Sequence, residues 1–157
     1  MAKEIEHKYL VISEDYKNQA SECLHIMQGY LCDEIDRTVR VRTRGSQAFL
    51  TIKGRNDGAT RVEYEYEIPY ADAQEMLHDL CKQPIIDKHR HIVMHEGNSW
   101  EIDEFHGLLE GLILAEIELP FESYTYNKPD FVGKNVTDDP RYYNSALAAS
   151  GKVPQQD

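Results

Sequence analysis

Charged and apolar residues alternate with a period of two along most of this chain. Successive side chains of a β-strand point to opposite faces, so this period predicts strands with one charged and one apolar face. We expect strands at residues 3–12, 28–33, 36–45, 48–54, 60–69, 86–96, 99–106 and 112–120. The dipeptides Gly45-Ser46 and Gly97-Asn98 stand between such runs and predict hairpin turns. Eight mostly consecutive strands with few helices predict a mainly β (α+β) fold, a closed eight-stranded antiparallel β-barrel, rather than a parallel α/β sheet.

Helices are expected to flank the barrel at three places. They cover residues 14–26, 71–81 and 138–149. The second helix has the clearest start, because Pro69 precedes it and Asp72 is a candidate N-cap or first-turn acid. A length of 157 residues suits one domain, so we expect residues 1–157 to form a single unit around one core.

The net charge of −11 argues against a general binder of nucleic acid or of membrane surfaces, because either would need a basic surface. It does not exclude a polyanionic small molecule, since binding depends on local charge. No apolar run approaches the roughly 20 residues that a membrane span needs, and Met1-Ala2-Lys3-Glu4 predicts no secretory signal. Cys23, Cys32 and Cys81 follow no metal-ligand spacing, so we expect reduced thiols in a cytoplasmic protein.

The charged faces of the expected strands are segregated by sign. The basic residues on these faces are Lys8, Arg40, Arg42, Arg44, Lys53, Arg61, Lys88 and Arg90. The acids are Glu4 and Glu6, Glu63, Glu65 and Glu67, Glu101 and Asp103, and Glu116 and Glu118. Like charges two residues apart on one face repel, so such clusters persist more readily when something neutralises them. The alternation alone leaves two interpretations open: a solvated outer face of a sheet, or a barrel interior that binds a charged ligand.

An interior that holds both signs suits a complex of a metal ion with a chain of phosphates. Carboxylate pairs from different strands suit Mg²⁺ or Mn²⁺, which are hard cations that prefer oxygen ligands. Arginine and lysine side chains on facing strands suit phosphate oxygens, which a guanidinium group can bind in bidentate fashion.

The charged motifs also follow a recognisable order. The chain opens with Glu4-Ile5-Glu6-His7-Lys8, which has the pattern E-x-E-x-K. The motifs after it are Gln28-Gly29-Tyr30-Leu31, Arg40-x-Arg42, Thr51-Ile52-Lys53-Gly54, Arg61-x-Glu63-x-Glu65, Lys88-x-Arg90, Trp100-Glu101-Ile102-Asp103-Glu104-Phe105 and Ala115-Glu116-Ile117-Glu118-Leu119. Together they resemble the CYTH superfamily, also called triphosphate tunnel metalloenzymes. Residues 132–137 and 140–144 are similar to the end of its short bacterial branch, although Asn135 stands where an acid is expected.

The resemblance implies an eight-stranded tunnel with charged side chains inside and helices outside. It also implies hydrolysis of a triphosphate, inorganic tripolyphosphate in the short branch, with Mg²⁺ or Mn²⁺ as the cofactor. The phosphate-binding residues that it implies are Lys8, Arg40, Arg42, Lys53, Lys88 and Arg90. The metal ligands that it implies, direct or through water, are Glu4, Glu6, Glu63, Glu65, Asp103, Glu116 and Glu118. Glu67 and Glu101 share these faces and are secondary candidates.

Catalytic roles are expected for Lys8, Glu63, Glu65 and Lys88. The basic residues hold the phosphate chain, and Glu63, Glu65 or a second metal ion orients the attacking water. Two alternatives are a class IV adenylate cyclase, which makes cyclic AMP from ATP, and a non-catalytic binder of polyphosphate or metal. The expected partner is a small-molecule triphosphate; we expect no nucleic acid and no membrane, and a homodimer is left open.

Overall fold

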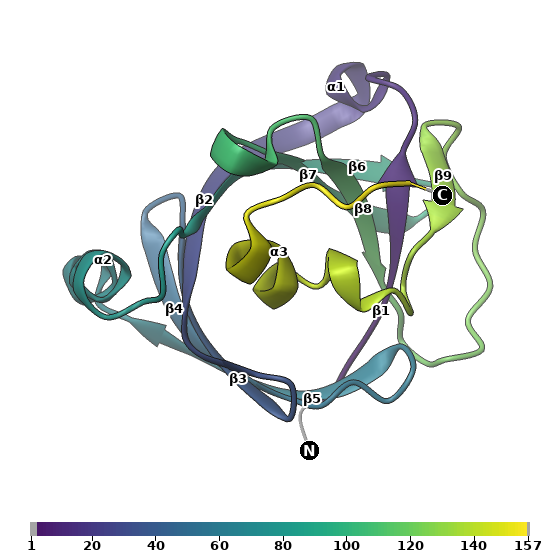
Figure 1. Cartoon of the computed structure of the whole chain (residues 1–157). Coiled ribbons are helices and arrows are strands. Elements are labelled where there is room, and N and C mark those ends of the chain that lie inside the picture. The colour runs from purple at the N-terminus through teal and green to yellow at the C-terminus, as the bar shows by residue number, and fades with distance from the viewer. Residues whose placement is uncertain (1–2, 157) are drawn as a thin grey trace.

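The fold is a closed antiparallel β-barrel, as the alternation predicts (Figure 1). The computed structural model describes residues 3–156. The strands are β1 (Lys3–Val11), β2 (Ala20–Glu34), β3 (Arg37–Arg44), β4 (Gln47–Gly54), β5 (Thr60–Ile68), β6 (Ile86–His95), β7 (Asn98–Phe105), β8 (Ile113–Glu118) and β9 (Val132–Asn135). The barrel follows the order β5-β4-β3-β2-β6-β7-β8-β1, and pairing of β1 with β5 closes the ring.

Strand β1 closes the barrel because it has neighbours on both sides. Its first residues pair with β5, its second half pairs with β8, and its last residues also pair with β9. The register with β8 sets Glu6 opposite Glu118 and Lys8 opposite Glu116. Acids from the first and the last strand of the barrel therefore share one wall.

Helices cover the outside of the ring and one of its ends. They are α1 (Tyr16–Gln19), α2 (Tyr70–Asp79) and α3 (Asn144–Ser150), with short 3-10 turns η1 (Gly107–Leu109) and η2 (Pro140–Tyr142). Figure 1 shows α2 outside the ring of strands, whereas α3 lies within its outline. Among the described residues, no helix is long and apolar enough to cross a membrane.

Much of the apolar core packs on the outer faces of the strands, because the inner faces are charged. On one side, Tyr16 of α1 and Trp100 of β7 cluster with Phe131, which follows β8 in the chain. On another side, Leu77 of α2 packs in a cluster with Val41 of β3. The helices and the long connection after β8 thus shield apolar surface that the strands turn outward.

One end of the barrel is closed by apolar side chains. Leu10, Phe105 and Leu114 share the inward parity of the charged residues on their strands. They are buried in a cluster with Tyr142 of η2 and Leu147 of α3. The interior is therefore charged in its middle and apolar at the end that the C-terminal segment covers.

The helix expected at residues 14–26 is wrong for most of that range. Helix α1 has only four residues, and β2 begins at Ala20 and runs for 15 residues. The central part of β2 pairs with β3 on one side and β6 on the other, and Ile26 and Gln28 are buried while His25 is exposed. Pairing on both edges decides the conformation here, because a short run of mixed residues has no strong preference of its own.

Smaller differences concern turns and the C-terminal region. Gly45 and Ser46 form the predicted hairpin turn, but the second turn is Glu96–Gly97, because Asn98 already pairs with His95. Glu96 and Gly97 both have positive φ, as tight hairpin turns require. The helix expected at residues 138–149 consists of η2 and α3, and the short strand β9 was not predicted.

Candidate active site

A charged tunnel occupies the middle of the barrel. Its larger cavity has a volume of about 190 Å³ and is lined by Glu4, Glu6, Arg40, Arg42, Arg44, Lys53, Glu63, Glu65, Arg90, Glu101, Glu116, Glu118 and Asn144. A narrower cavity of about 40 Å³ adjoins it and adds Lys8, Tyr30, Thr38, Asn56, Arg61, Thr137, Tyr143 and Ser145 to the lining. The two cavities share Glu6, Arg40, Lys53 and Asn144, so they are consecutive parts of one tunnel.

Most of the residues singled out from the sequence line this tunnel. They are Lys8, Arg40, Arg42, Lys53 and Arg90 among the bases, and Glu4, Glu6, Glu63, Glu65, Glu116 and Glu118 among the acids. The charged faces of the strands therefore point inward, which excludes a solvated outer face for these positions. Lys88 and Asp103 do not line either cavity, and both are fully buried. Of the secondary candidates, Glu101 lines the larger cavity and Glu67 lies on the exposed part of β5.

Strand β3 supplies a basic wall that has little counter-charge. Arg40 and Arg42 are only 6% and 8% exposed. Arg40 donates from Nη2 to Thr51 Oγ1 at 3.3 Å and lies 3.9 Å from a Glu65 oxygen, but its buried Nε has no partner within residues 3–156. Arg42 donates from Nε to Gln28 Oε1 at 2.8 Å, and among the described residues it forms no ion pair.

The pKa of the Arg42 guanidinium group reflects its burial and this lack of nearby anions. Burial lowers the pKa of Arg42 to about 9, and the neighbouring cations Arg40 and Arg90 add to that effect. Asp103 and Glu101 oppose the shift without cancelling it. A bound anion would therefore reduce the electrostatic repulsion between the cations of the basic wall.

The opposite wall holds carboxylates that lack cations. Burial raises the pKa of Glu6 well above its usual range, and the nearby Glu116 and Glu4 raise it further. Burial likewise raises the pKa of Glu118, helped by the charges of Glu4 and Glu101. Within residues 3–156, neither Glu6 nor Glu118 forms an ion pair.

The other tunnel acids are partly neutralised by lysines. Lys53 Nζ lies 2.9 Å from Glu4 and 3.2 Å from Glu63. Burial alone would raise the pKa of Glu4, but Lys53 lowers it to about 2. Lys8 Nζ lies 3.6 Å from Glu116 and, despite burial, holds the pKa of that carboxyl below its usual range.

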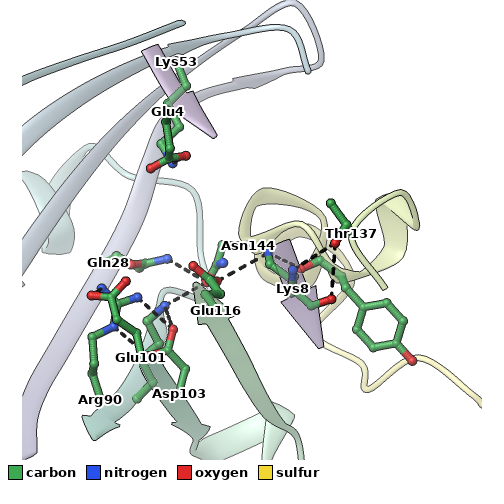
Figure 2. Close-up of polar contacts among 12 residues, drawn as sticks. Glu4, Lys8, Gln28, Lys53, Arg90, Glu101, Asp103, Glu116, Thr137 and Asn144 are labelled. Atoms are coloured by element: carbon green, nitrogen blue, oxygen red, sulfur yellow. Dashed lines mark hydrogen bonds and ion pairs between the residues drawn. The ribbon is translucent and has the colours of Figure 1, made fainter. Parts of the chain in front are cut away.

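A buried ion cluster lies behind the tunnel wall (Figure 2). Asp103 receives two hydrogen bonds from Arg90, at 2.8 and 2.9 Å, and one from Lys88 at 2.7 Å. Burial lowers the pKa of Lys88 to about 7; Asp103 favours its charged form, but Arg90 and Arg42 repel it. Arg90 also donates to Glu101 at 2.9 Å, so the cluster fixes Arg90 at the edge of the cavity.

The C-terminal segment contributes contacts that the sequence did not reveal. Lys8 Nζ donates to the carbonyl oxygen of Tyr142 at 3.0 Å. Asn144 Oδ1 accepts from Lys88 Nζ at 3.1 Å and from Gln28 Nε2 at 3.0 Å. Gln28 and Asn144 lie in motifs that resemble the family, but neither belongs to the charged alternation, so no physical signal in the sequence marked them as site residues.

Asn135 has a local role that is consistent with its neutral side chain. Its Oδ1 accepts hydrogen bonds from the backbone and the hydroxyl group of Thr137. Thr137 Oγ1 in turn accepts from the backbone N–H of Lys8 at 3.0 Å. The departure from the expected acid therefore affects the anchoring of the C-terminal segment on β1 and leaves the tunnel carboxylates in place.

Comparisons with known proteins agree with this geometry. Residues 2–143 match the model of the CYTH domain family. An inorganic triphosphatase from Acetivibrio thermocellus is 49% identical over 147 residues, which cover 94% of each chain. An inorganic triphosphatase from Nitrosomonas europaea is 34% identical and covers 94% of this chain and 97% of its own. The crystal structure of the inorganic triphosphatase NE1496 superposes with a TM-score of 0.67 at 31% identity, over 99% of both chains.

Proposed function

Because this chain belongs to the CYTH domain family, we propose that it hydrolyses inorganic tripolyphosphate in the tunnel with the help of a divalent cation. Two relatives that span nearly the whole chain are inorganic triphosphatases, which supports this substrate. One observation supports it most strongly: within residues 3–156, the buried Arg42 has no carboxylate partner, Glu6 and Glu118 have no cation partner, and all three line the same cavity. Such a cavity has room for an anion and a cation bound together.

The anion contacts are assigned to Lys8, Arg40 and Lys53 first, with Arg42 and Arg90 beside them. Within residues 3–156, Arg40 Nε is buried without a partner, Lys53 lines both cavities, and Lys8 lines the narrower one. Hydrogen bonds from charged donors to phosphate oxygens are short and strong, and a guanidinium group can make two in parallel. Positioning and neutralising a phosphate chain supplies most of what phosphoryl transfer needs from a protein.

The donor set also fits a hard divalent cation. Glu6 and Glu118 face each other across β1 and β8 and form no ion pairs within residues 3–156. In that part of the chain, no three carboxylate, imidazole or thiol groups could hold a metal ion by themselves. That arrangement suits Mg²⁺ or Mn²⁺, because Mg²⁺ is commonly held by one or two carboxylates together with substrate phosphates.

The direct metal ligands are assigned to Glu6 and Glu118. Glu4 and Glu116 are assigned contacts through water, because Glu4 pairs with Lys53 and Glu116 with Lys8. When bound, the cation would neutralise charge on the phosphate chain and polarise its oxygens. Like-charge repulsion between Glu6, Glu116 and Glu4 keeps the site ready for such a cation. Asp103, by contrast, is fully buried and already paired with Arg90 and Lys88, so its contribution to a metal site would be indirect.

The hydrolytic step is assigned to the carboxylates of β5. Glu65 accepts a hydrogen bond from Thr51 Oγ1 at 3.2 Å, and Glu63 has a pKa raised by burial and by its hydrogen bond with Glu4. Either can orient a water molecule for in-line attack on the terminal phosphorus. A bond forms between phosphorus and the water oxygen, the bond to the bridging oxygen breaks, and the water proton passes to a carboxylate. The products are orthophosphate and diphosphate.

Lys88 is assigned a supporting part in this scheme. Its amino group is held behind the cavity between Asp103 and Asn144. A direct role for Lys88 in catalysis or phosphate binding, as the family resemblance implies, requires its Nζ to reach the tunnel. The variant Lys88→Met separates the two roles, because a direct contact predicts loss of tripolyphosphate affinity as well as turnover.

The experiment that tests the proposal is a substrate panel. The protein is incubated with Mg²⁺ or Mn²⁺ and tripolyphosphate, thiamine triphosphate or ATP. We expect orthophosphate release to be fastest with tripolyphosphate. Formation of cyclic AMP from ATP would indicate the cyclase alternative, and binding without turnover would indicate the non-catalytic binder.

A homodimer stays a prediction. Ile52, Tyr64 and Tyr66 are exposed, and Ile52 pairs directly with Tyr64 across β4 and β5. An apolar strip of this kind on a barrel favours self-association. Light scattering at several protein concentrations checks it, and a constant monomer mass would rule it out.

A further inference from the structure

The side chain of Asn144 lies at the junction between the C-terminal helix and the tunnel. Asn144 is the first residue of α3 and lines both cavities. Its Oδ1 accepts from Gln28 Nε2, as Figure 2 shows, and also from Lys88 Nζ. Lys88 Nζ is the donor in this contact, so the carboxamide presents its oxygen, and not its nitrogen, to Lys88.

The orientation of Gln28 is fixed in the same way. Gln28 is fully buried, and its Oε1 accepts from Arg42 Nε at 2.8 Å. A guanidinium group has only donors, so the Gln28 nitrogen is left to face Asn144. A continuous chain of hydrogen bonds thus runs from Arg42 on β3 through Gln28 and Asn144 to Lys88 on β6.

This chain leaves the amino group of Asn144 without a protein partner. Nδ2 carries two donors, and among residues 3–156 it makes no hydrogen bond to a protein acceptor. The rest of the tunnel lining near Asn144 includes Arg40 and Lys53, which are assigned to the phosphate chain. The Asn144 amino group is therefore a neutral donor, held in one orientation, beside the basic wall.

We infer that Asn144 donates from Nδ2 to a phosphate oxygen of bound tripolyphosphate, and that Gln28 is the positioning residue that orients it. The inference rests on the proposed function, since it names a further contact of the same site. It gives α3 a part in substrate binding besides closing one end of the barrel. Gln28 lines neither cavity, so it acts through Asn144 and Arg42.

Two substitutions of Asn144 separate a substrate contact from a purely structural role. The variant Asn144→Asp keeps an oxygen acceptor for Lys88 and Gln28 but has no donor for the tunnel. The variant Asn144→Ala loses both. Thermal shift at pH 7 with Mg²⁺ gives, for each protein, the tripolyphosphate concentration needed for the same rise in melting temperature, and released orthophosphate is measured separately.

We expect both variants to need at least about tenfold more tripolyphosphate, since one hydrogen bond to a charged group corresponds to about tenfold or more in affinity. The ligand-free Asp variant should melt no lower than the wild type. A structural role predicts the opposite order, with Asn144→Asp binding like the wild type and only Asn144→Ala impaired, and that order would overturn the inference. Gln28→Leu should show a smaller loss, because Lys88 still orients Asn144.

The matched control is Asn18→Asp, which makes the same change of charge on exposed α1, away from the tunnel. It should bind and turn over tripolyphosphate like the wild type. If the wild type binds tripolyphosphate but releases no phosphate, the proposed hydrolysis fails while the binding series still decides the role of Asn144. If the wild type shows no tripolyphosphate shift, both proposals are overturned.

Discussion

Replacing Arg42 by methionine should stabilise the ligand-free protein and weaken its binding of tripolyphosphate. The guanidinium group is 8% exposed, forms no ion pair within the described residues, and has Arg40 and Arg90 as neighbours. Methionine fills similar space without charge and adapts to irregular surroundings. The substitution should raise the free energy of unfolding but lower the affinity for tripolyphosphate. One variant therefore tests whether the basic wall serves to bind an anion and not to stabilise the ligand-free fold.

The expected gain in the free energy of unfolding follows from the pKa shift of Arg42. A fall of the pKa from 12.5 to about 9 corresponds to about 5 kcal/mol of unfavourable free energy for holding the charge, at about 1.4 kcal/mol per tenfold change. At pH 7 the group is charged in the folded and unfolded states, so the whole penalty applies. Between pH 9 and 12.5 the folded state releases its proton first, and the penalty declines as pH rises.

Part of the gain is offset in the variant. Gln28 Oε1 loses its donor, and a buried unsatisfied acceptor costs about 1–3 kcal/mol. The net stabilisation is then about 2 kcal/mol or somewhat more, which for a chain of this length raises the melting temperature by roughly 4–8 °C. Tripolyphosphate should stabilise the variant much less than it stabilises the wild type, because a charged contact is missing.

The assay is thermal and urea denaturation at pH 7 in EDTA, followed by titration with tripolyphosphate and Mg²⁺. Arg37→Met is the control, since within the described residues the Arg37 side chain makes only an exposed ion pair with Glu34 at 2.9 Å, and the change in net charge is the same. Loss of that pair should change stability by less than about 1 kcal/mol. If Arg42→Met is less stable than both wild type and control, the buried charge of Arg42 does not destabilise the ligand-free protein and the reasoning is refuted.

Three further predictions follow from the same geometry. Lys53→Ala should lose most of the thermal stabilisation by tripolyphosphate with Mg²⁺. Orthophosphate should raise the melting temperature of the wild type less than tripolyphosphate does. Equal shifts for the two anions would argue against a site for a linear triphosphate. EDTA should abolish phosphate release and Ca²⁺ should inhibit it, since Ca²⁺ prefers longer and looser coordination; activity after exhaustive chelation would contradict the metal assignment. Glu4 has a lowered pKa of about 2, so its pairing with Lys53 contributes stability above about pH 4.5 that is lost as pH falls toward 2. In Glu4→Gln, the free energy of unfolding should fall less steeply over this pH range. An unchanged pH dependence would show that the pair contributes nothing.

The strands and the direction of their faces were predictable because the signal is local. Arg40 and Arg42, or Glu116 and Glu118, are two residues apart, and the pleat of a strand puts such residues on one face. Segregation by sign left an interior and a solvated surface both open, and the family resemblance implied the interior. These residues do line the tunnel. Eight mostly consecutive strands predicted a closed barrel, but alternation does not determine the register that brings Glu6 opposite Glu118.

Alternation did not predict how deep along the barrel axis each inward-facing side chain lies. Asp103 and Glu101 share a face, yet Asp103 is fully buried in an ion cluster while Glu101 reaches the cavity. The difference depends on which end of the barrel is closed by apolar residues, and that is set by the docking of α3. The contacts of Gln28 and Asn144 depend on the same docking, which joins residues 116 positions apart in the sequence.

The error at residues 14–26 has a related cause. Ile26 and Gln28 are buried in alternation with exposed His25, but the run before them has no clear period. Its strand conformation comes from pairing with β3 and β6, which are distant in sequence. Local preference was too weak to indicate either structure, and tertiary contacts decided the outcome.

The central claim is that the charged interior of the barrel is where a triphosphate is hydrolysed. Phosphorus NMR of tripolyphosphate with Mg²⁺ tests it most directly, comparing the wild type with Arg40→Ala and with the exposed control Arg37→Ala. The account predicts that the wild type and Arg37→Ala convert tripolyphosphate to diphosphate and orthophosphate. Arg40→Ala should be at least about tenfold slower at low substrate, as expected for loss of one charged hydrogen bond, while it remains folded by circular dichroism. Equal rates for all three proteins would contradict the claim, because hydrolysis would then take place without the basic wall of the tunnel.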